Sequence, residues 1–146
     1  MSHEPIRFEQ NFSASASQVW SAITDPDQMR QWFFEELEDF KTETGFQTQF
    51  EVDCEGKIYA HFWTVEDVLP EQRLVYRWHY GGVTGDSKVT WELSPIDDGG
   101  TQLKFAHEVI EPFPTDDPNF SREAGVEGWN YIINDRLTDF LQRQNS

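Results

Sequence analysis

The chain has a single cysteine, Cys54, so it cannot form an intramolecular disulfide and needs no oxidising compartment. It has no uninterrupted apolar run long enough to span a bilayer. The segment from Met1 to Pro5 also lacks the basic start and apolar run of a signal peptide. We therefore expect a cytoplasmic protein with no membrane insertion.

Basic residues are scarce: the chain has 11 Lys and Arg residues and 27 Asp and Glu residues. Its formal net charge is therefore -16. Such a charge repels phosphate backbones and anionic lipid headgroups, so no nucleic-acid partner is expected. The four histidines are far apart and without paired ligand spacing, and no metal site or other cofactor is predicted. The chain also lacks a G-x-S-x-G nucleophile elbow and a phosphate-binding loop.

Aromatic residues are abundant and make up 15% of the 146 residues. Twelve Phe, six Trp and four Tyr carry a large apolar surface, which argues against disorder. The length suits one domain over residues 1–146 with a single hydrophobic core.

The N-terminal part is predicted to form a strand followed by two short helices. Apolar and polar residues alternate over Ile6–Phe12, as in a half-buried strand. Ser15 and Gln18 have the spacing of a capping box, and that helix is predicted to end at Thr24. Asp25–Pro26 supplies a capping carboxylate and a first-turn proline for the second helix.

The middle of the chain has the pattern of an antiparallel meander. Turn residues separate its strands at Glu55–Gly56, Pro70–Glu71, Gly81–Gly85 and Asp97–Gly100. Alternation over Arg73–Tyr80 and in the next two strands gives one continuous apolar face. The run Ile58–Leu69 is apolar on both sides, so it is predicted to be bulged or covered on both faces.

The C-terminal part is predicted to be one long amphipathic helix, with Asp117 as its cap and Pro118 as its first residue. Its apolar stripe consists of Val126, Trp129, Ile133, Leu137, Phe140 and Leu141. This order of elements predicts an α+β helix-grip fold. A curved antiparallel sheet of about six strands wraps around the last helix, and two short helices follow strand one.

Several segments resemble one family, the homologues of the activator of the heat-shock-protein-90 ATPase. The matching segments are Ser17–Pro26 with Trp32, Val68–Trp78, Val89–Leu93, Gly99–Thr101 and Gly128–Trp129. This family belongs to the START-like, or SRPBCC, superfamily, which includes the birch-pollen allergen. The resemblance covers nearly the whole chain and implies a helix-grip fold that encloses a hydrophobic cavity.

The aromatic face suggests a ligand site between the sheet and the last helix. Its predicted lining consists of Trp32, Tyr76, Trp78, Tyr80, Trp91, Phe105, His107, Trp129 and Ile133. In that site His107 or Tyr76 would orient a polar group of the ligand. A filled core made of the same residues is the alternative. His3 and His61 have no special context, and alternation places His79 on the opposite face.

Three functions remain open from the sequence. The leading hypothesis is non-enzymatic binding of a small hydrophobic or aromatic molecule. The second is a co-chaperone module that docks on a heat-shock chaperone ATPase, with the acidic run Glu35–Asp39 as a candidate surface. The third, by analogy with the superfamily, is a cyclase- or hydratase-like enzyme that uses His107 with a nearby carboxylate.

Overall fold

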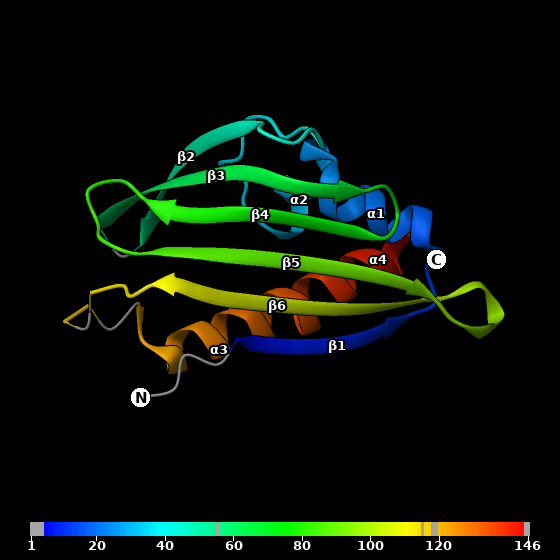
Figure 1. Ribbon diagram of the computed structural model, residues 1–146. Coiled ribbons are helices and arrows are strands. Elements are labelled where there is room, and N and C mark those ends of the chain that lie inside the picture. The colour runs from blue at the N-terminus through cyan, green and yellow to red at the C-terminus, as the bar shows by residue number, and fades with distance from the viewer. Residues whose placement is uncertain (1–4, 55, 115, 118–119, 145–146) are drawn as a thin grey trace.

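A six-stranded sheet covers the C-terminal helix in the computed structural model, which describes residues 5–54, 56–114, 116–117 and 120–144 (Figure 1). The strand order is β1-β6-β5-β4-β3-β2, and every neighbouring pair is antiparallel. The α+β helix-grip prediction is confirmed. The strands are β1 Ile6–Phe12, β2 Gln47–Cys54, β3 Lys57–Leu69, β4 Arg73–Tyr80, β5 Asp86–Pro95 and β6 Thr101–Glu111.

The helices of the described residues lie after β1, between β5 and β6, and after β6. They are α1 Ala16–Thr24, α2 Pro26–Trp32, the short 3-10 helix η1 Asp97–Gly99, α3 Arg122–Asn130, the π-helix η3 Tyr131–Leu137 and α4 Thr138–Gln144. Within the described residues, none of the helices is both long enough and apolar enough to cross a membrane.

The two predicted helices after β1 are confirmed together with their caps. The Ser15 hydroxyl accepts the backbone N–H of Gln18 at 3.2 Å, and the Gln18 side chain accepts the backbone N–H of Ser15 at 3.0 Å. The Asp25 carboxylate caps α2 by accepting the backbone N–H of Asp27 at 3.2 Å. Local hydrogen bonding therefore defines both helix starts.

Pro118, the predicted first residue of the C-terminal helix, lies outside the described residues, and the described α-helix begins four positions later. Helix α3 begins at Arg122, and its cap is the Ser121 hydroxyl, which accepts the backbone N–H of Ala124 at 3.1 Å. The Asp117 carboxylate bonds a tyrosine and a lysine of β3. Val126, predicted to belong to the apolar stripe, is 37% exposed.

The C-terminal helix contains a π-helical segment, which the sequence reading did not predict. Four of its five buried side chains, Trp129, Ile133, Leu137 and Leu141, recur every four residues, and Phe140 is the fifth. In an α-helix such steps rotate the stripe by about 40° each. The i to i+5 turns of a π-helix hold more residues per turn and reduce this drift. The wider turns therefore keep the stripe facing the sheet.

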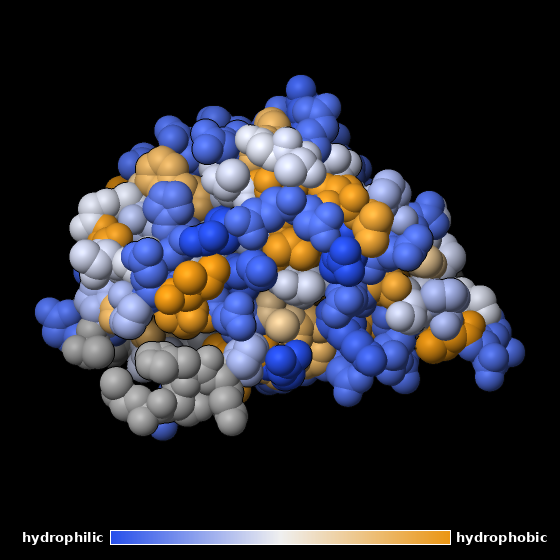
Figure 2. All heavy atoms as spheres, in the orientation of Figure 1, coloured by the Kyte–Doolittle hydropathy of each residue, from blue (hydrophilic) through white to orange (hydrophobic). Residues whose placement is uncertain are grey.

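Alternation along the strands separates a buried inner face from a charged outer face. The predicted bulge in β3 is confirmed by a register shift between Val65 and Asp67. On the outer face, opposite charges pair across strands: Glu9 lies opposite Lys104, and Glu92 lies opposite both Lys104 and Arg73. Such pairs contribute roughly 0.2–1 kcal/mol each. Figure 2 shows a largely hydrophilic surface with separate apolar areas.

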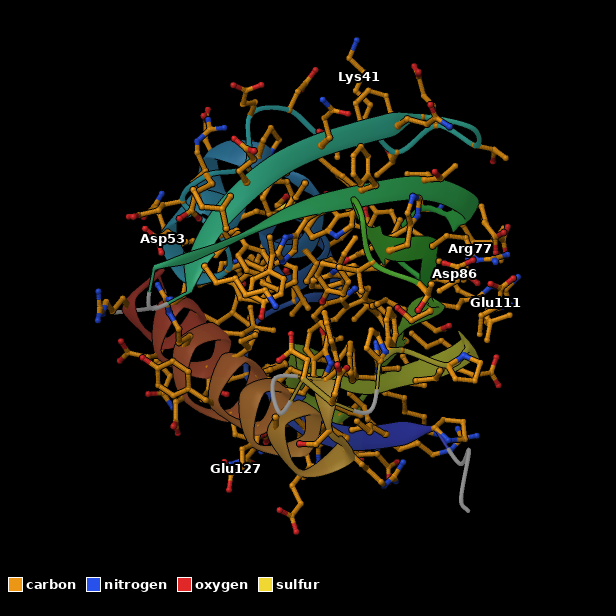
Figure 3. The ribbon with its side chains drawn as sticks, turned by 90° about the vertical axis from the view of Figure 1, so that its left-hand side faces the viewer. Lys41, Asp53, Arg77, Asp86, Glu111 and Glu127 are labelled. Carbon is orange, nitrogen blue, oxygen red and sulfur yellow. The ribbon has the colours of Figure 1, made fainter. Side chains whose placement is uncertain are left out.

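The inner face curves over the C-terminal helix, and side chains occupy the space between them (Figure 3). Charged residues at the periphery, such as Arg77 and Asp86, point away from this space and form an ion pair with each other. Apolar and aromatic side chains from the sheet, α1, α2 and the C-terminal helix form one core cluster. The interior therefore combines high aromatic content with charges kept outside.

Replacing Ser15 by alanine should lower the free energy of unfolding by about 1 kcal/mol, because the N–H of Gln18 loses its acceptor. Urea denaturation measures this effect. Ser13→Ala is the matched control, because Ser13 is exposed just before the helix. Equal losses in the two variants would show that the cap is not what stabilises α1.

Candidate functional site

The inner face of the sheet is built by period-two alternation in four neighbouring strands. Its members from β3 and β4 pair directly across the strands: Trp63 lies opposite Trp78, and His61 lies opposite Tyr80. Strands β5 and β6 continue the face with Trp91 opposite Phe105 and Val89 opposite His107. Adjacent strands thus place these side chains on one surface.

The structure brings the nine predicted residues together in this interior. Trp129 from the helix contacts Phe105, His107 and Trp78, with ring centroids 4.4, 5.8 and 5.5 Å away. Trp91 contacts Trp32 edge-on at 6.0 Å. The remaining members join through Trp78 with Tyr80, the hydrogen-bonded pair Trp91 and Tyr76, and the fully buried Ile133. Whether they bind a ligand stays a prediction.

Two of the tryptophans in this cluster use their indole N–H groups within the protein. Trp32 donates to the backbone carbonyl of Ala22 at 2.8 Å, which ties α2 to α1. Trp91 donates to the Tyr76 hydroxyl at 3.1 Å. Burial raises the pKa of Tyr76, and the bond from Trp91 opposes this only in part. Tyr76 is therefore an uncharged phenol in the core.

Three other nitrogens of the interior have no hydrogen-bond partner in the described structure. They are Nε1 of Trp63, Nε1 of Trp78 and Nδ1 of His107. Trp63 is 1% exposed and Trp78 is 5% exposed, so water at the surface does not reach their N–H groups. An unpartnered buried polar group costs roughly 1–3 kcal/mol. A finished structural core normally satisfies such groups.

The Tyr80 hydroxyl lies near the Trp78 indole but does not complete its bonding. Burial raises the pKa of Tyr80, and the nearby Trp78 N–H opposes that rise. No hydrogen bond forms between the two groups, because their geometry does not meet the requirements of one. The Trp78 N–H therefore remains available to another acceptor.

Two histidines, the buried His61 and the half-buried His107, contribute uncharged imidazoles to the interior. Burial lowers the pKa of His107 to about 4. Burial also lowers the pKa of His61 to about 4, opposed by a hydrogen bond to the Tyr59 carbonyl. The Nδ1 of His61 lies 3.0 Å from that oxygen, so it carries the proton and donates it. Nδ1 of His107 has no hydrogen-bond partner among the described residues, a carboxylate included.

The sequence reading missed several members of this cluster. His61 was assigned no context, yet it stacks on Phe50 at 5.0 Å and contacts Tyr80 edge-on at 4.8 Å. Trp63 was placed in a strand but not in the site. The alternation of Tyr59, His61 and Trp63 along β3 is the sequence pattern that places His61 and Trp63 on the inner face. Phe33, which follows α2, stacks on Trp32 at 4.9 Å and on Trp63 at 5.5 Å, and no periodicity revealed this contact.

One end of the interior is bordered by the segment that precedes α3. Phe120 contacts Tyr80 at 5.1 Å and Tyr59 at 5.7 Å. The Tyr59 hydroxyl donates to the Asp117 carboxylate at 2.9 Å, and the Lys57 ammonium lies 3.0 Å from the same oxygen. These contacts place a charged pair at the rim while the rings lie inside.

Two hollows lined by described residues lie outside the interior. One is on the outer face of the sheet and includes Arg73 and Val75. The other runs beside the C-terminal helix and includes Tyr131 and Arg136. Neither hollow is lined by any of the nine predicted residues. The enclosed cavity predicted between sheet and helix is therefore still a prediction.

The curved sheet, the helix that it covers and the aromatic interior define a START-like protein with the helix-grip fold. The chain belongs to the family described as "Activator of Hsp90 ATPase homolog 1-like protein", whose model matches residues 13–142. This family assignment agrees with the resemblance seen in the sequence. No curated protein matches the chain.

Solved structures share the fold at low sequence identity. Protein CV1439 from Chromobacterium violaceum has a TM-score of 0.77 at 21% identity, and the match covers 94% of this chain and 96% of that chain. CalU16 from Micromonospora echinospora has a TM-score of 0.69 at 26% identity, and the match covers 94% of this chain and 75% of CalU16. DynU16, from the dynemicin biosynthetic locus, has a TM-score of 0.75 at 24% identity. That match covers 97% of this chain and 48% of DynU16.

Stability should fall as the pH drops from about 7.5 to about 5, by about 2 kcal/mol for each of His61 and His107. The folded-state pKa lies below the unfolded value, so the unfolded chain takes up the proton first. Stability is therefore complete above the unfolded pKa and declines below it. Urea denaturation across this range measures the slope.

The double variant His61→Gln and His107→Gln is the comparison for this slope, because it keeps polar side chains but removes both titrating groups. Its unfolding free energy should change less over the same interval. Identical pH profiles for the variant and the parent protein would contradict the assignment of buried neutral imidazoles.

Proposed function

We propose that this protein binds a small, mostly apolar or aromatic molecule between the inner face of the sheet and the C-terminal helix, without catalysing a reaction. The observation that carries this proposal is the set of unpartnered nitrogens of Trp63, Trp78 and His107 in an otherwise apolar interior. A guest that supplies their missing partners removes an energetic cost that the free protein bears.

Aromatic rings give the affinity for such a guest. A molecule the size of one aromatic side chain buries roughly 200 Å² and gains about 5 kcal/mol by the hydrophobic effect, before the cost of association. The rings of Trp78, Trp129 and Phe105 already contact one another, so the guest must displace some of these contacts. Moderate affinity for a simple aromatic probe is the expected result.

The uncharged fluorescent probe 1-aminoanthracene tests this function. On titration, the indole N–H signals of Trp78 and Trp129 in a proton–nitrogen NMR spectrum should shift, whereas the signal of Trp20, a half-buried residue of α1, should not. The chain has six tryptophans, so single Trp→Phe variants assign the signals.

The matched control for this titration is Tyr131→Ala, because Tyr131 is 55% exposed on the C-terminal helix and lines an outer hollow. It should leave the probe's affinity unchanged. Probe binding that shifts no interior indole signal, or no binding at all, would refute the proposed site.

A second candidate function is docking on a heat-shock chaperone, which the family description suggests, and we propose the cytoplasm as its location. The observation that favours it is a fixed acidic surface after α2. The Arg30 guanidinium donates to the carbonyls of Leu37 and Glu38 at 2.9 and 3.2 Å, and the side chains of Glu35 and Glu38 are exposed. This surface would complement a basic patch on a partner.

Pull-down with a purified chaperone of the ninety-kilodalton class tests this docking. The double variant Glu35→Gln and Glu38→Gln should weaken capture several-fold and reduce its salt dependence. The control pair Glu43→Gln and Glu51→Gln removes the same charge from exposed positions elsewhere. Equal capture of both pairs would eliminate the acidic surface as the contact.

A further inference from the structure

The groups that face the interior are uncharged near neutral pH. Burial lowers the pKa values of His61 and His107 to about 4, and burial raises those of Tyr76 and Tyr80. The charged pair of Lys57 and Asp117 is at the rim, where the two charges compensate each other. A charged guest would therefore lose its hydration without gaining a counter-charge.

Two of the unpartnered nitrogens can act in only one way. The indole nitrogens of Trp63 and Trp78 are hydrogen-bond donors and never acceptors. The two side chains are a direct cross-strand pair, with ring centroids 5.1 Å apart. They are more than nine-tenths buried, and neither has a partner among the described residues. The missing partner must be an acceptor atom.

The rings around these donors favour a flat guest. Phe33 stacks on Trp63 at 5.5 Å, and Trp129 contacts Trp78 edge-on at 5.5 Å. Aromatic rings contact one another through offset-stacked or edge-to-face arrangements, which a planar guest can replace with little loss. A planar molecule with an oxygen at its edge satisfies both the rings and the donors.

We propose that the guest is an uncharged, planar aromatic molecule with a carbonyl-type oxygen, and that the indole N–H groups of Trp63 and Trp78 recognise this oxygen. This inference rests on the proposed ligand-binding function and adds the chemistry of the ligand. His107, whose Nδ1 also has no partner, supplies a further polar contact for a second substituent.

Three probes of nearly the same shape test the inference by isothermal titration calorimetry. Fluorene has no acceptor, 9-fluorenone adds one carbonyl oxygen, and 9-fluorenone-2-carboxylate adds a negative charge. Fluorenone should bind about tenfold more tightly than fluorene, which corresponds to one hydrogen bond of about 1.4 kcal/mol. The carboxylate should bind more weakly than fluorenone.

The double variant Trp63→Phe and Trp78→Phe keeps aromatic rings at both positions but removes both donors. It should bind fluorene and fluorenone with nearly equal affinity. Trp20→Phe is the matched control, because Trp20 is a half-buried residue of α1 that is not among the nine predicted lining residues. This control should retain the preference for fluorenone.

A measurement on the unaltered protein keeps the test decisive even where a variant fails to fold. The carbonyl stretching band of bound fluorenone should lie at lower frequency than in an apolar solvent, as expected for a hydrogen-bonded carbonyl. An unshifted band, or equal affinity for fluorene and fluorenone, would overturn the ligand chemistry while leaving the binding function intact. Failure of all three probes and of 1-aminoanthracene would remove the binding function itself.

Discussion

The contact between the aromatic inner face of the sheet and the C-terminal helix is the constraint on which the rest of the structure depends. Trp129 of the helix contacts three strands, through Phe105 of β6, Trp91 of β5 and Trp78 of β4. The π-helical segment that follows it keeps Ile133 and Leu137 on the same side. Without this alignment the helix would rotate part of its apolar stripe away from the sheet.

Large rings fill volume efficiently but bring polar atoms into the core. The structure satisfies some of these atoms internally, as with Trp32 on the Ala22 carbonyl and Trp91 on the Tyr76 hydroxyl. It leaves Trp63, Trp78 and His107 with unpaired nitrogens. Buried hydrogen-bonding groups without partners are unusual in finished cores and are more readily explained by a guest. The family assignment agrees with this explanation but does not identify the guest.

Much of the fold was predictable because its signals are local. The Ser15 and Gln18 capping box, the Asp25 cap and the strand alternation each depend on neighbouring residues. The contributions of Phe33 and of the π-helix were not predictable, since both depend on how distant elements pack. The contact of Asp117 with Tyr59 and Lys57 was not predictable either, because it joins segments nearly sixty residues apart. The place of His61 was obscured because β3 is apolar on both sides and bulged, which blurs its alternation.

A high-resolution crystal structure of the purified protein tests the central claim most directly. The account predicts electron density for a guest or an ordered water within hydrogen-bond distance of the indole nitrogens of Trp63 and Trp78. It would be contradicted by a core in which both indole N–H groups donate to groups of the protein and no density for a guest lies between the sheet and the helix.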